Sequence, residues 1–120
     1  MTFIGITKDF DLKNEEQYNT IGKFWDDMSE AYGLEKLQGL GYLWHNGKIS
    51  YAIGLKEGSV DGSNFSMELP DDGWTSVCGR TDDLKQIYDE IYKDGPLILE
   101  IEEFFENGDC TIKFIRASLS

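Results

Sequence analysis

The alternation of apolar and polar residues predicts a strand, a helix and a hairpin in the first half of the chain. Thr2–Lys8 alternates in the manner of a half-buried strand. A helix is expected from an N-cap at Asn14 to a stop at Gly33, because apolar side chains recur there every three or four residues. Leu37–Leu55 alternates on both sides of Asn46-Gly47, which predicts a hairpin around that turn.

The second half repeats this order. Phe65–Leu69 is a candidate short strand, and Trp74–Gly79 is a longer one. Thr81 is a suitable N-cap for a helix whose apolar stripe ends before Gly95. Leu97–Ala117 then predicts a second hairpin.

The second hairpin carries glutamates within an apolar run. A two-residue type I′ turn at Asn107-Gly108 predicts that Glu102 lies opposite Lys113 and that Glu100, Glu102 and Phe104 share one face. A carboxylate among apolar groups must be solvated, neutralised or given a cationic partner. The face is therefore either a binding surface for an amphipathic cation or a wetted outer face with a Glu102–Lys113 pair.

The first hairpin has one bulky face and one face of small residues. Counting outward from Asn46-Gly47 pairs Tyr42 with Tyr51 and Leu40 with Ile53 on the bulky face, which suits helix packing. Nearly all residues of the other face are small: Gly39, Gly41, Leu43, Ser50, Ala52 and Gly54. Glycines in a strand indicate either close approach of a ligand or backbone, or simple bending of the sheet.

The two halves together predict an α+β fold in one domain over residues 1–120. We expect duplicated β-α-β-β units, about residues 1–56 and 64–118, that form one antiparallel sheet with two helices on one face and a ligand groove on the other. Across that groove, the small residues of the first half would face Glu100, Glu102 and Phe104.

Composition narrows the range of partners. The formal net charge is −12, and no cluster of Lys and Arg occurs, which argues against direct binding to nucleic acid or to an anionic membrane. Acidity favours cationic ligands, although solubility alone is the commoner reason for it. Cys78 and Cys110 lack metal-ligand spacing and suggest reduced, buried thiols of a cytoplasmic protein. The N-terminus predicts neither a signal peptide nor a membrane helix.

The candidate chemistry is a carboxylate surrounded by aromatic rings. No phosphate-binding loop or dinucleotide motif occurs, and His45 is the only histidine, so we expect no cofactor and no metal site. Glu102 is the candidate counter-ion and Glu100 its helper, with an aromatic wall supplied by three residues: Trp74, Phe104 and Tyr51. The two glutamates, on the order of 7 Å apart, also resemble an inverting hydrolase pair in a generic way.

Four motifs in order resemble the GyrI-like small-molecule-binding domains, also called AraC effector-binding domains. Ile21-Gly22-Lys23-Phe24-Trp25 is similar to the family's I-P-x-L-W, with Gly22 in place of proline, and residues 51–55 are similar to its Y-x-x-G-V strand. Leu69–Trp74 resembles the I-P-x-G-x-Y turn, with Trp74 in place of tyrosine. Ile101–Phe104 resembles F-E-x-Y, with Phe104 in place of tyrosine.

This resemblance implies a duplicated fold whose motif glutamate, Glu102 here, contacts cationic lipophilic ligands. Three functions are then compatible with the sequence. The first is a stand-alone binding module that senses or sequesters small amphipathic cations. The second is a hydrolase of reactive small molecules in which Glu102 acts on water. The third is an acidic protein-interaction module whose partner is a regulator or DNA gyrase.

Overall fold

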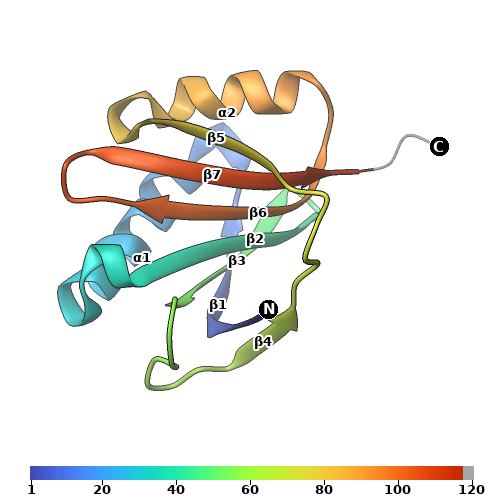
Figure 1. The fold of residues 1–120 in the computed structure, drawn as a ribbon. Helices are drawn as coiled ribbons and strands as arrows, with labels where there is room; N and C mark the ends of the chain where they lie inside the picture. The colour runs from blue at the N-terminus through green and yellow to red at the C-terminus, as the bar shows by residue number, and fades with distance from the viewer. Residues whose placement is uncertain (118–120) are drawn as a thin grey trace.

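The computed structural model describes residues 1–117, in which seven strands form one antiparallel sheet accompanied by two α-helices (Figure 1). The α+β class is therefore confirmed. The strands are β1 (Thr2–Asp11), β2 (Leu37–His45), β3 (Lys48–Leu55), β4 (Phe65–Glu68), β5 (Thr75–Arg80), β6 (Leu97–Phe104) and β7 (Asp109–Arg116). The helices are α1 (Gln17–Tyr32) and α2 (Leu84–Lys93), with short 3-10 turns η1 (Lys13–Glu15), η2 (Leu34–Lys36) and η3 (Thr81–Asp83). The sequence predicts a terminal tail over Ala117–Ser120, of which residues 118–120 lie outside the described residues.

The two halves of the sheet have the same connectivity. The strand order is β4-β1-β3-β2-β6-β7-β5, so β1, β3 and β2 form one half while β5, β7 and β6 form the other. In each half a helix follows the outer strand, and a hairpin follows the helix. The halves meet in the middle of the sheet, where β2 pairs with β6. Strand β4 is added at one edge, beside the first residues of β1.

Both helices pack on the same face of the sheet. From α1, Trp25 packs with Tyr51 of β3 and Phe104 of β6, and the Trp25 and Phe104 rings meet edge to face. From α2, Tyr88 packs with Ile112 of β7. Burial of these apolar stripes is the main stabilising contribution of each helix. The two helices lie over different halves of the sheet, and the centre of the face lies between them (Figure 1).

The opposite face of the sheet is covered by protein as well. A second cluster there joins Phe3 of β1, Leu40 of β2 and Ile101 of β6 with residues of β4 and of the loop after it. Strand β1 crosses β3 closely, because a Cβ atom on either Gly5 or Gly54 would collide with the other strand's backbone. Here the expectation that strand glycines mark close backbone approach is met.

The first hairpin turns where the sequence predicts, but its register changes partway. Asn46 and Gly47 both have positive φ, 50° and 73°, as a type I′ turn requires. A bulge at Tyr42 then shifts the pairing, so that Tyr51 lies opposite Gly41. The predicted pairs of Tyr42 with Tyr51 and of Leu40 with Ile53 were wrong, since a bulge inserts one unpaired residue that a count from the turn does not include.

Three local predictions also differ from the structure. Asn14 does not cap α1, because it lies inside η1 with a φ of 56°, and α1 begins at Gln17. Thr81 lies in η3, and its hydroxyl group donates to the Asp109 carbonyl at 3.4 Å instead of capping α2. Cys110 is buried as predicted, whereas Cys78 is exposed on the edge strand β5. Gly33 does end α1, with a φ of 96°.

Candidate functional site

The register of the second hairpin determines what surrounds the glutamates. Phe104 pairs with Cys110, and the backbone of residue 105 bonds to that of residue 109. Residues 106–108 therefore form a three-residue loop in place of the predicted two-residue turn. Gly108 has a φ of 92°, whereas Asn107 does not have positive φ, as in a type I turn followed by a bulge. The predicted pairing of Glu102 with Lys113 was therefore wrong, and Glu102 lies opposite Ile112.

This register places the glutamates on the helix-covered face. Glu100, Glu102 and Phe104 share a face, as predicted, but the β7 residues beside them are the apolar Phe114, Ile112 and Cys110, which pack against the helices. The groove was predicted on the face of the sheet that lies away from the helices. These three residues instead face the space between α1 and α2, so the predicted side was wrong for them. Glu100 and Glu102 are each only 4% exposed, which excludes a wetted outer face.

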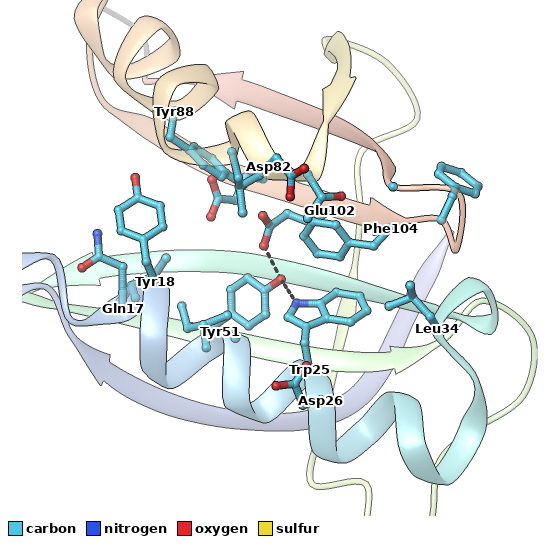
Figure 2. Close-up of a pocket in the computed structure, with 18 of the residues that line it drawn as sticks. Gln17, Tyr18, Trp25, Asp26, Leu34, Tyr51, Asp82, Tyr88, Glu102 and Phe104 are labelled. Atoms are coloured by element: carbon cyan, nitrogen blue, oxygen red, sulfur yellow. Dashed lines mark hydrogen bonds between the residues drawn. The ribbon is translucent and has the colours of Figure 1, made fainter.

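A chain of hydrogen bonds holds Glu102. The indole Nε1 of Trp25 donates to the hydroxyl oxygen of Tyr51 at 2.8 Å, and that hydroxyl group donates to Glu102 Oε1 (Figure 2). Tyr51 and Trp25 are themselves buried. Three elements, α1, β3 and β6, therefore fix the orientation of one carboxyl group, as is usual where a buried polar group must be satisfied.

Two glycines of β2 provide the room for this cluster. Gly39 pairs with Glu102, and Gly41 pairs with Glu100. A Cβ atom on Gly39 would overlap the Tyr51 hydroxyl group, and one on Gly41 would lie 2.7 Å from Glu100 Oε1. The predicted juxtaposition of small residues with the two glutamates is present, and side chains of the protein occupy part of the space that those glycines leave.

Neither buried glutamate has a basic partner among residues 1–117. The neighbouring Glu103 is different, because it points to the other face and forms an ion pair with Lys56 at 2.9 Å. Burial is the main cause that raises the pKa of both Glu100 and Glu102 above the usual 4.5, and the charge of Glu102 raises that of Glu100 further. The hydrogen bond from the Tyr51 hydroxyl group offsets part of this rise at Glu102.

The tyrosines around the carboxyl groups stay protonated. Burial raises the pKa of Tyr51 and Tyr88 well above 10, and the charge of the glutamates adds to it. For Tyr18, burial and the charge of Asp89 raise the pKa to about 12. The phenols of this site therefore remain neutral hydrogen-bonding groups at neutral pH.

A cavity of about 510 Å³ lies between the helices, above the two glutamates. This volume is within the range of small-molecule sites. Figure 2 shows Tyr18 and Trp25 reaching it from α1 and Tyr88 from α2, with Glu102 between them. Among residues 1–117, its lining contains four acids, Asp26, Asp82, Glu100 and Glu102, and no Lys, Arg or His. The cavity is therefore apolar and aromatic in its walls and negative in its charge.

The structure brings together four of the five predicted site residues. Glu100, Glu102, Phe104 and Tyr51 all line the cavity. Trp74 is separate, because it belongs to the cluster on the opposite face, where its indole nitrogen donates to the carbonyl oxygen of Pro70.

The helices supply site residues that the predicted site did not include. Gln17, Tyr18 and Trp25 of α1 and Tyr88 and Tyr92 of α2 line the cavity. The signal in the sequence was the presence of Tyr and Trp in the apolar stripes of both helices. These side chains carry a hydroxyl or N–H group, which a purely aliphatic stripe lacks.

Comparison of the chain with models of known protein families, with curated proteins and with solved structures finds no match. Within residues 1–117, no helix has the length and apolar character needed to cross a bilayer. In the same part of the chain, no three His, Cys, Asp or Glu side chains are grouped so as to hold a metal ion.

Proposed function

We propose that this chain is a binding module for small amphipathic cations, which it holds in the cavity between α1, α2 and the sheet. The observation that carries the proposal is that two glutamates, each 4% exposed, face this cavity without a basic partner among the described residues. A buried carboxylate without a counter-ion is costly, and a ligand cation supplies that counter-ion.

The walls of the cavity suit the apolar part of such a ligand. Trp25 and Phe104 form one wall and Tyr88 another, so a planar or lipophilic body is buried against rings. Aromatic faces also attract cations directly. The motif resemblance to GyrI-like domains supports the same class of ligand, and we further propose that the two halves of the chain arose by duplication of one β-α-β-β unit.

The test is a titration of lipophilic cations, such as rhodamine 6G and tetraphenylphosphonium, followed by calorimetry and by Trp fluorescence. At about 4 Å and an effective dielectric constant near 20, an ion pair contributes about 4 kcal/mol before desolvation. We therefore expect Glu102→Gln to weaken binding at least about tenfold, or about 1.4 kcal/mol.

Glu103→Gln is the matched control, because Glu103 neighbours Glu102 on β6 but pairs with Lys56 away from the cavity. This variant is expected to bind like the wild type. Equal affinity of wild type and Glu102→Gln, or no binding by either, contradicts the proposal.

A second candidate function is hydrolysis of a reactive small molecule. It is favoured by the burial of two neighbouring carboxyl groups, Glu100 and Glu102, which raises the pKa of both above the usual value, a feature common among general acids and bases. In that case a carboxylate accepts a proton from an attacking water molecule. Turnover of a cyclopropane-bearing electrophile that is lost in Glu102→Gln would distinguish hydrolysis from binding alone.

A further inference from the structure

Unpartnered polar atoms gather in the cavity. Among the described residues, three buried side-chain atoms have no hydrogen-bond partner in the protein: Gln17 Oε1, Tyr88 Oη and Glu100 Oε2. All three residues line the same cavity, although they come from α1, α2 and β6. Buried polar atoms are nearly always paired, so three exceptions that converge from separate elements on one cavity point to a ligand.

Burial separates these atoms from ordinary surface groups. Glu100 is 4% exposed and Tyr88 is 5% exposed. Figure 2 shows the Tyr88 ring entering the cavity from α2, above the Tyr51–Glu102 hydrogen bond. The neighbouring Glu102 already accepts from Tyr51, so within the pair it is Glu100 that presents an oxygen without a protein donor.

The chemistry of the three atoms specifies the complementary ligand. A carboxylate oxygen and an amide oxygen only accept hydrogen bonds, and a phenol oxygen accepts as well as donates. A ligand that pairs with all three must therefore carry hydrogen-bond donors, and the donor that meets the Glu100 carboxylate belongs to its charged end. Ammonium, amidinium and guanidinium groups present two or more N–H donors together with the positive charge, whereas quaternary ammonium and phosphonium groups present none.

We propose that the cavity selects cations that donate N–H hydrogen bonds, such as protonated primary amines, amidines and guanidines, over quaternary cations of the same shape. This inference rests on the proposed function and narrows its ligand class. Glu100 is the residue that sets the selectivity through its free Oε2 atom, and Tyr88 Oη takes a second N–H. Glu102, held by Tyr51, supplies charge to either class of cation.

The matched probes are (naphthalen-1-ylmethyl)ammonium and its N,N,N-trimethyl analogue, which share the aromatic body and the charge. Their affinities are measured by calorimetry at pH 7.5 with the wild type, Tyr88→Phe, Glu100→Gln and the control Glu103→Gln. The expected result is a preference of at least tenfold for the primary ammonium in the wild type and in Glu103→Gln. The preference is expected to fall below threefold in Tyr88→Phe and Glu100→Gln.

The ratio of the two affinities reports on donation of hydrogen bonds and not on folding, because a general loss of structure weakens both probes alike. Tyr88→Phe keeps the ring and removes only an unpartnered hydroxyl group, so it is expected to fold. Equal affinities in the wild type, or tighter binding of the quaternary probe, overturn the selectivity while leaving the cation-binding proposal intact. Failure of the wild type to bind either probe or tetraphenylphosphonium overturns both proposals.

Discussion

Replacement of Glu100 by glutamine is expected to stabilise the protein above pH 4.5, in exchange for ligand affinity. Burial and the charge of Glu102 raise the pKa of Glu100 in the folded state, while in the unfolded chain it returns to about 4.5. The folded state then binds a proton more tightly than the unfolded state. The free energy of unfolding of the wild type must therefore fall as the pH rises from about 4.5 through the raised pKa, and it levels off above that value.

The magnitude follows from the same linkage. Each unit by which the folded pKa exceeds the unfolded pKa costs about 1.4 kcal/mol once the pH is above both. A glutamine has nearly the same shape and no charge, so it removes this cost together with the repulsion from Glu102. Taking the usual cost of an unpaired buried polar group, we expect a gain of about 1–3 kcal/mol at pH 8 and little change at pH 4.

The assay is urea unfolding at pH 4, 6 and 8, with thermal melts in parallel. For a domain of this size, 1 kcal/mol corresponds to a change of roughly 3–6 °C in Tm. Glu103→Gln is the control of opposite sign, because it breaks the Lys56 ion pair and is expected to cost at most about 1 kcal/mol at pH 8. Two results would refute the inference that burial of the Glu100 carboxylate destabilises the folded state. One is a Glu100→Gln variant no more stable than the wild type at pH 8, and the other is a variant equally stabilised at pH 4 and pH 8.

Three further predictions concern the groups around this carboxyl pair. Tyr51→Phe removes the hydroxyl group that accepts from Trp25 and donates to Glu102. The free energy of unfolding, measured in urea, should fall by about 1–3 kcal/mol, and an unchanged midpoint would contradict that role. Gly41→Ala places a Cβ atom 2.7 Å from Glu100 Oε1, so the carboxyl group must shift. Binding of primary ammonium probes should become weaker, and an unaltered Kd in calorimetry would contradict this prediction. Gly22→Ala adds a methyl group inside α1, where no atom of residues 1–117 outside the adjoining helix backbone lies within 4 Å. It should raise stability by about 0.5–1 kcal/mol, and a lower Tm would contradict this prediction.

Periodicity and turn chemistry alone predict most of the local structure. Both helices and all seven strands occur near their predicted positions, because a stripe with a period of 3.6 and an alternation with a period of 2 are properties of neighbouring residues. Gly33 and the turn at Asn46-Gly47 are likewise local, since they depend on the positive φ that glycine and asparagine tolerate. The sharing of one face by Glu100, Glu102 and Phe104 follows from strand alternation in the same way.

The register of the two hairpins could not be predicted in this way. The turn at Asn107-Gly108 has a sequence suited to a two-residue loop, yet the loop contains three residues, and this changes every partner of β6 along β7. The bulge at Tyr42 has the same effect in the first hairpin. The loop length and the bulge both depend on how the whole sheet twists and packs, and neither can be recognised from the few residues that form it.

The chain alone thus determined that two acidic side chains and Phe104 occupy one face of a β-strand, within an α+β domain of high negative charge. Only the tertiary structure decided that this face lies under both helices, that Trp74 belongs to the other side, and that Gln17 and Tyr88 join the site. The physical reason is that burial is a property of elements distant in sequence. A carboxylate becomes unusual only when other segments remove its water, and no local pattern records which segments those are.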